Sequence, residues 1–110
     1  MSIFQNQELM EPSLLQEAIQ LLQKDFDLPA VQSELTEEQL IILFTPVLQH
    51  LLNRDFERLL QICYKIDLGE NTFKHILHES EPNEMASDLA RAIIARHKLK
   101  IEIRRRYSAG

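Results

Sequence analysis

The sequence contains very little cysteine and glycine, and no tryptophan. Its single cysteine, Cys63, excludes both an intramolecular disulfide and a zinc site built from several thiolates. Glycine occurs only at positions 69 and 110, so the chain has no glycine-rich phosphate loop, dinucleotide-binding fingerprint or nucleophile elbow. We therefore expect no catalytic residue, no cofactor and no enzymatic activity.

Long apolar runs are also missing. No stretch approaches the roughly 20 apolar residues that a membrane-spanning helix needs, and residues 1–8 lack the basic and apolar segments of a signal peptide. These absences predict a cytoplasmic protein with no membrane partner. With two glycines and four prolines, the composition also differs from that of disordered or turn-rich all-β chains.

The patterns that are present predict an all-α fold. Ser13 with Gln16, and Thr36 with Gln39, have the spacing of capping boxes, which begin helices. Apolar residues follow both at helical intervals, and Pro46 predicts a kink in the second helix. We expect one domain over residues 1–110, a small up-and-down bundle of about five helices, with residues 1–11 as a flexible arm. The predicted central helix spans 37–52, and the long C-terminal helix spans 82–105.

Charge is divided unevenly along the chain. Residues 1–90 contain five Lys or Arg against sixteen Asp or Glu, whereas residues 91–110 contain seven Lys or Arg against Glu102 alone. Cations near the end of a helix are favoured by its dipole, which accounts for part of this basic end. The remainder indicates a surface that attracts acidic protein, including residues 1–90 of a second copy, or phosphate.

The C-terminal helix carries two apolar stripes. One, which we expect to face the core of the chain, consists of Met85, Leu89, Ala92, Ile93, Leu99 and Ile103. The other contains Ala90, Ile94, His97 and Ile101. A surplus stripe indicates contact with a partner, although two helices of the same domain on either side would produce the same pattern.

These features predict a non-catalytic protein-interaction or adaptor module that forms a homodimer or binds another protein. The predicted partner-binding residues are Ile94, His97, Ile101, Arg104, Arg105 and Arg106. On this interpretation, Ile94→Lys with Ile101→Lys converts a dimer into a folded monomer. The alternative is nucleic-acid binding through the basic C-terminal helix, from Arg91 to Arg106, but Tyr107 is the one aromatic residue beside it, where stacking platforms have several.

Two segments resemble known sequences. One is Leu51-Leu52-x-x-Asp55-Phe56-x-x-Leu59-Leu60-x-x-x-Tyr64-x-Ile66-Asp67, and the other is Leu89-Ala90-x-x-Ile93-Ile94-x-Arg96, with a basic end closing on Arg106-Tyr107. Over about residues 51–107 the chain resembles a set of short uncharacterised bacterial all-helical proteins. The resemblance implies a folded helical unit and brings no activity, cofactor or site residue with it.

Four smaller groups of residues are candidates for a metal site, a reactive thiol, an ion pair and a helix cap. His75 and His78 have a spacing that permits metal binding, but a third ligand is missing, so we predict no metal site. Cys63 lies on an apolar stripe and is predicted to be a buried, inert thiol. Arg96 interrupts an apolar stripe and should pair with Asp55 or Asp67. The spacing of Asp67 and Glu70 predicts another capped helix start.

Overall fold

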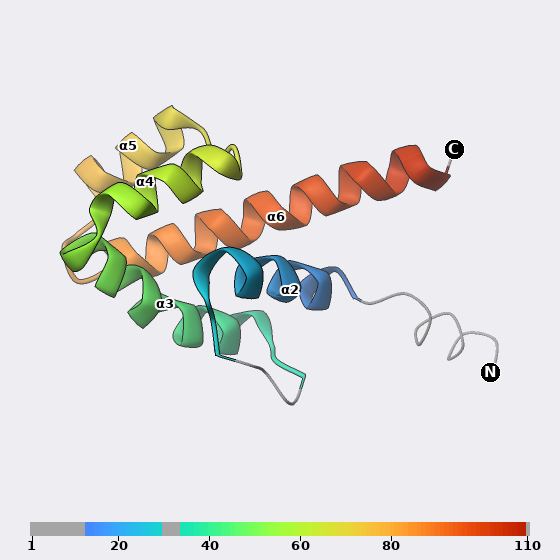
Figure 1. Ribbon diagram of the computed structural model, residues 1–110, viewed down its shortest axis with the longest axis horizontal. Coiled ribbons are helices and arrows are strands. Elements are labelled where there is room, and N and C mark those ends of the chain that lie inside the picture. Colours follow the sequence, from blue (N-terminus) through green and yellow to red (C-terminus); the bar gives the residue numbers. More distant parts are fainter. Residues whose placement is uncertain (1–12, 30–33, 110) are drawn as a thin grey trace.

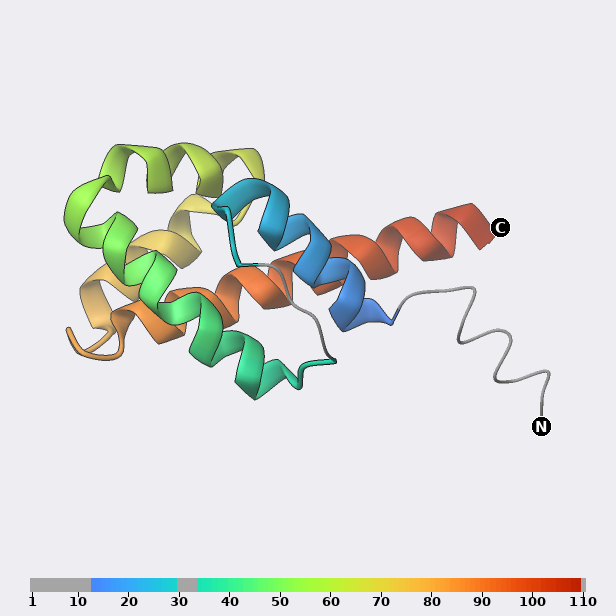
Figure 2. The same cartoon turned by 60° about the horizontal axis from the view of Figure 1, so that its bottom comes forward.

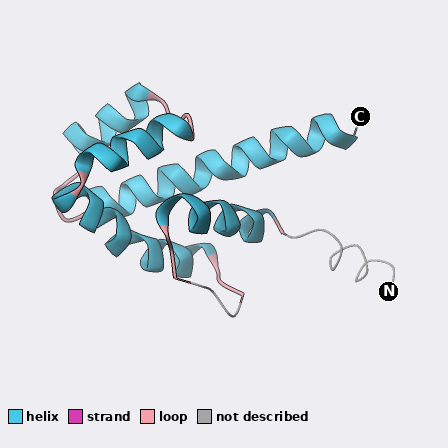
Figure 3. Ribbon diagram, viewed as in Figure 1, coloured by secondary structure: helices cyan, strands magenta, loops and turns pink. Residues whose placement is uncertain are grey.

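The computed structural model describes residues 13–29 and 34–109, which form five helices and contain no strand (Figures 1 and 3). Their bounds are α2 Leu14–Phe26, α3 Glu37–Arg54, α4 Phe56–Lys65, α5 Glu70–Glu79 and α6 Met85–Ala109. The predicted all-α bundle of five helices with a long final helix is thus confirmed. The predicted arm over residues 1–11 lies outside the described residues.

Both predicted capping boxes are present. The Gln16 backbone N–H donates to Ser13 Oγ over 3.0 Å, and the Ser13 N–H donates to the Gln16 side chain over 3.1 Å. Thr36 and Gln39 make the same reciprocal pair at 3.1 and 2.9 Å. Each box satisfies two backbone groups that a helix start leaves unpaired. The second of these helices, α3, continues through Pro46 to Arg54.

The two short helices begin in different ways. Asp55 separates α3 from α4, and its side chain accepts a hydrogen bond from the Arg58 N–H over 3.3 Å. The predicted cap of α5 by Asp67 is wrong, because the N-cap is Gly69, with φ +100° and no side-chain cap. Asp67 itself has φ +59°, and its carboxylate bonds Arg96 instead. Gly69 suits its position because positive φ costs glycine little.

The long helix α6 organises the molecule. It contacts α3 most extensively, then α2 and α5, while α4 packs on α3. In Figure 1, α4 and α5 lie on one side of α6, and α2 and α3 lie on the other. The carboxyl-terminal end of α6 projects beyond the other helices, as Figure 2 also shows. The centre of the core consists of side chains with almost no solvent exposure: Leu22, Leu40, Phe44, Leu48, Leu59, Leu89, Ile93 and Ile94.

Candidate functional site

The predicted partner surface of α6 lies in the interior of the chain. Ile94 and Ile101 are each 1% exposed, and His97 is 4% exposed. His97 and Ile101 line a small hollow together with Leu21 of α2 and Ile66, which follows α4. The expectation that these three side chains meet a partner is therefore corrected. A helix of 25 residues is about 37 Å long, and α2 and the residues at the end of α4 lie beside His97 and Ile101 in the same chain.

The stripe predicted to face the core is exposed over its later part. Leu99 and Ile103 are 44% and 38% exposed, whereas Leu89 and Ile93 of the same stripe are fully buried. The physical reason is that α2 packs on the opposite face of this part of α6, where Ile101 is buried, while the carboxyl-terminal end of α6 projects beyond the other helices (Figure 1). Tyr107 is 83% exposed and lies one turn beyond Ile103.

The basic end of α6 forms ion pairs within its own chain. Arg104 Nη2 and Arg105 Nη2 contact the two carboxylate oxygens of Glu17, on α2, at 2.8 and 2.6 Å. Arg106 lies 3.8 Å from Glu102. The other contacts are Arg91–Glu38 at 3.0 Å, Arg96–Asp67 at 3.0 Å, Lys98–Glu37 at 2.7 Å and a hydrogen bond from Lys100 to the Ile66 carbonyl at 2.8 Å.

These pairs explain the division of charge along the sequence. The acidic residues of α2 and α3 meet the basic residues of α6 when the chain folds, so the two halves neutralise each other across helix contacts. The expected pairing of Arg96 with Asp55 or Asp67 is confirmed for Asp67. Arg104, Arg105 and Arg106, predicted to attract a partner, have carboxylates of their own chain as neighbours.

An apolar groove lies between α4 and α5, and we call it the α4–α5 groove. The two helices make little direct contact with each other because α4 packs on α3 and α5 packs on α6. The groove encloses about 330 Å³. Its lining residues are Phe56, Leu60, Cys63, Tyr64, Asp67, Gly69, Glu70, Phe73, Lys74 and Leu77.

The α4 side of this groove is an exposed stripe with helical spacing. Phe56, Leu60 and Tyr64 stand four residues apart and are 39%, 38% and 84% exposed. The ring of Phe56 lies 6.0 Å from that of Phe73 on α5, between centroids, so the two aromatic side chains join the helices across the groove. Cys63 and Phe73 are almost fully buried. The groove therefore combines a buried apolar base with exposed apolar side chains along one edge.

The charged groups of the groove pair at its rim. Lys74 Nζ contacts Glu70 Oε1 at 2.9 Å along α5, and this lysine lowers the pKa of Glu70 through a hydrogen bond and its charge. Asp67 contacts Arg96 of α6 at 3.0 Å. Because these groups satisfy one another, the groove itself presents apolar surface, and its Asp67 end adjoins α6 one turn before Leu99.

The groove is hard to predict from sequence because Phe56, Leu59, Leu60, Cys63 and Ile66 recur at intervals of three and four and together resemble one apolar face. The structure divides them between two directions, since Leu59 and Ile66 are buried whereas Phe56 and Leu60 are partly exposed. The available signal was the interval of four residues from Phe56 through Leu60 to Tyr64. That interval marks a second stripe, rotated from the core stripe.

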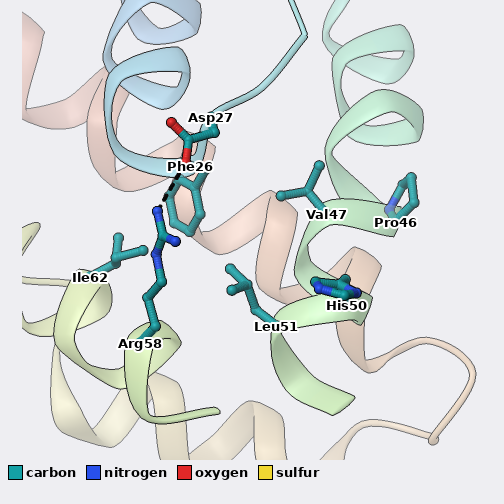
Figure 4. A pocket seen from close by; sticks show the side chains of 8 residues that line it. All are labelled: Phe26, Asp27, Pro46, Val47, His50, Leu51, Arg58 and Ile62. Carbon is teal, nitrogen blue, oxygen red and sulfur yellow. Dashed lines mark hydrogen bonds and ion pairs between the residues drawn. The ribbon is translucent and has the colours of Figure 1, made fainter. Parts of the chain in front are cut away.

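A second hollow, of about 490 Å³, lies among α2, α3 and α4 (Figure 4). Its lining residues are Phe26, Asp27, Pro46, Val47, His50, Leu51, Arg58 and Ile62. Arg58 is already bonded to Asp27 over 3.0 Å, along the side of the hollow formed by α2 and α4. Phe26, Leu51 and Ile62 in its lining are buried. This hollow therefore presents fewer exposed apolar side chains than the α4–α5 groove.

Cys63, His75 and His78 are the side chains that the sequence offered for chemistry. Burial raises the pKa of the Cys63 thiol to about 12, which leaves almost no nucleophilic thiolate at neutral pH. His75 and His78 are exposed, and among residues 13–29 and 34–109 no three side chains of the metal-binding types are grouped around a common point.

His97 is the buried polar residue of α6. Desolvation lowers its pKa, as does the charge of Lys100, while Asp25 acts in the opposite direction. Its Nε2 atom has no hydrogen-bond partner among the described residues. The neutral imidazole therefore packs as part of the contact between α6 and α2.

None of the described helices combines the length and the apolar character required to cross a membrane. Comparison with known proteins found no matching family model, no matching curated protein and no matching solved structure. The resemblance to short bacterial proteins over residues 51–107 is thus supported in its coarse form alone: the chain is a small all-helical protein.

Proposed function

We propose that this protein is a non-catalytic protein-interaction module and that its α4–α5 groove binds an amphipathic helix. The observation that carries the proposal is the stripe of Phe56, Leu60 and Tyr64, which remains exposed beside a buried apolar base. Apolar side chains at such intervals favour the helix-in-groove mode of recognition, in which anchors every three or four residues enter an apolar groove. Aromatic residues are also the side chains most often found as interface anchors.

A protein ligand suits this groove better than a small molecule. Small-molecule sites direct a few polar groups toward the ligand, and these groups set its orientation. Here Glu70 pairs with Lys74, and Asp67 pairs with Arg96, at the rim. The groove therefore offers apolar contact along its length and little that would orient a compact polar ligand.

The alternative functions have less support. A nucleic-acid interface needs cations that contact phosphates, whereas the cations of α6 are engaged with Glu17, Glu37, Glu38 and Asp67. An enzyme needs groups that act together at one point, whereas the charged groups of the two hollows form ion pairs: Arg58 with Asp27, Lys74 with Glu70 and Arg96 with Asp67.

Site-specific photo-crosslinking in the source cells tests the proposal. A photoreactive phenylalanine replaces Tyr64, which is 84% exposed at the groove, and in a control chain it replaces Ile42, which is 71% exposed on α3. We expect covalent protein adducts from position 64 and none of the same mass from position 42. Absence of any protein adduct at position 64, or identical adducts from both positions, would refute the interaction module.

A further inference from the structure

We propose that the α4–α5 groove binds the carboxyl-terminal half of α6 from a second copy of this chain, so that two copies form a closed dimer. This inference rests on the proposed function and names its partner. The segment of α6 concerned presents Leu99, Ile103 and Tyr107, and we call this set the α6 stripe.

The α6 stripe matches the groove in spacing and length. Leu99, Ile103 and Tyr107 stand four residues apart, as do Phe56, Leu60 and Tyr64. Each set spans nine residues, and its first and last members are about 12 Å apart along a helix axis. Both sets are partly or largely exposed, with an aliphatic residue in the middle and a tyrosine at the carboxyl end. Two stripes of equal pitch and length can interdigitate along their whole length.

The groove of the same chain is out of reach of its own α6 stripe. Asp67, at the end of the groove, contacts Arg96 of α6, and α6 continues as one helix beyond that point. In Figure 1 the remaining length of α6 runs past the turn between α4 and α5 and away from these two helices. Only the stripe of another molecule can therefore enter.

The position of the two surfaces suits a two-fold arrangement. The contact between Asp67 and Arg96 places the end of the groove one turn before Leu99, so groove and α6 stripe lie on adjoining surfaces of one molecule. A two-fold axis between them brings each stripe to the other molecule's groove, and both grooves are filled at once. Such a self-complementary contact closes at two copies and leaves no open site for further growth.

Charge does not oppose the same pairing. Asp67 and Glu70 at the groove are paired with Arg96 and Lys74, and Arg104 and Arg105 of α6 are paired with Glu17. Arg106 has a longer contact, 3.8 Å to Glu102, and its side chain is 71% exposed. It lies next to Tyr107, where it can approach Glu70 at the rim of a second molecule's groove.

The surface area that each chain must bury to form a stable dimer is a small part of its total surface. A stable protein interface removes about 800 Å² from each partner, roughly a tenth of the 7823 Å² that the chain exposes. A dimer with two groove contacts has two separate apolar centres, each composed of residues that are already exposed in the single chain.

Sedimentation equilibrium of the full chain tests the dimer. We expect the wild type to associate to twice its monomer mass, and Leu60→Asp or Ile103→Asp to raise the dimer dissociation constant about 30-fold or more, the effect of losing one interface anchor. Ile42→Asp is the matched control, because Ile42 is exposed on α3, outside both surfaces. Circular dichroism verifies that each variant is folded. A wild type that stays monomeric at all concentrations overturns the inference.

Disulfide trapping identifies the surfaces that meet. In chains whose native cysteine is removed by Cys63→Ala, one chain carries Leu60→Cys and a longer, tagged chain carries Ile103→Cys. After mixing and oxidation with copper phenanthroline, we expect the mixed disulfide to form faster than either homodimeric disulfide. Rapid self-crosslinking of Ile103→Cys instead indicates that two α6 stripes meet each other, which overturns the groove as the binding site.

These outcomes separate the two proposals. If the wild type is monomeric, but the photoreactive residue at position 64 yields an adduct with a different protein, the interaction module stands and the second copy is rejected. If neither experiment detects a partner, both proposals fail.

Discussion

Replacing Ile101 with alanine tests the assignment of the buried face of α6. Ile101 is 1% exposed, and Ile→Ala removes three carbon groups. At about 0.8 kcal/mol for each buried group, the transfer term is about 2.4 kcal/mol. Incomplete collapse of the cavity adds to this cost, so Ile101→Ala should lower the free energy of unfolding by about 2–5 kcal/mol.

The matched control is Ile42→Ala, which makes the same chemical change on a helix. Ile42 is 71% exposed, so its replacement should alter the free energy of unfolding by no more than about 0.5 kcal/mol. The change in helix propensity is the same at both sites and cancels in the comparison. Urea denaturation followed by circular dichroism at one protein concentration measures both values. Equal costs at the two positions would refute the buried placement of Ile101.

The same reasoning revises the expectation for lysine substitutions. Ile94→Lys with Ile101→Lys places two ammonium groups where both wild-type side chains are 1% exposed. An unpaired charge in the interior is very costly, and domains of this size have a net stability of only about 5–15 kcal/mol. We therefore expect the double variant to be unfolded, as measured by loss of its helical circular dichroism signal.

Three further predictions follow from individual sites. Because burial raises the pKa of Cys63 to about 12, its reaction with a thiol reagent at about pH 8 should be roughly a thousandfold slower in the folded than in the unfolded protein. Burial also lowers the pKa of His97, so the unfolded state binds a proton first as pH falls. The free energy of unfolding should be constant above about pH 6.5 and decrease below it by up to about 1.4 kcal/mol per pH unit, a loss absent from His97→Leu. Thr36→Ala removes the side-chain acceptor of the α3 cap and should cost about 1 kcal/mol by urea denaturation, whereas Thr36→Ser should cost less.

Each of these three predictions, on Cys63, His97 and Thr36, has a result that would contradict it. Fast labelling of native Cys63 would mean that the base of the α4–α5 groove opens readily to solvent. A stability that falls equally with pH in wild type and His97→Leu would assign the effect to other groups. Equal stability of Thr36→Ala and wild type would show that the capping box contributes nothing to the fold.

Local structure was the part most readily predicted from sequence. The two capping boxes depend on residues three positions apart, and each begins its helix as expected. The cap of α5 was predicted less well, because Asp67 has the spacing of a cap but bonds a residue 29 positions away. Competition between a local and a distant partner for one carboxylate is not visible in a short sequence window.

The orientation of α6 was the part that sequence reasoning inverted. Periodicity divided its apolar residues correctly into two stripes, but it contained no information on where the neighbouring helices end. Ile101 is buried on the face of α6 that meets α2 and Ile66, whereas Leu99 and Ile103, on another face of the same end, remain partly exposed. Burial depends on neighbours far apart along the chain, and those neighbours are set by the turns between helices.

The sequence by itself determined that the described residues are helical, where α2 and α3 begin, that the one thiol is buried, and that Arg96 needs a carboxylate. These outcomes follow from spacing, capping chemistry and the cost of an unpaired charge, all of which act over a few residues or on single groups. Only the tertiary structure decided which stripe of α6 faces outward, that several cations of α6 pair with Glu17, Glu37 and Glu38, and that α4 and α5 separate to leave a groove. Each of these arises from packing between helices, where small changes in turn geometry decide which faces meet.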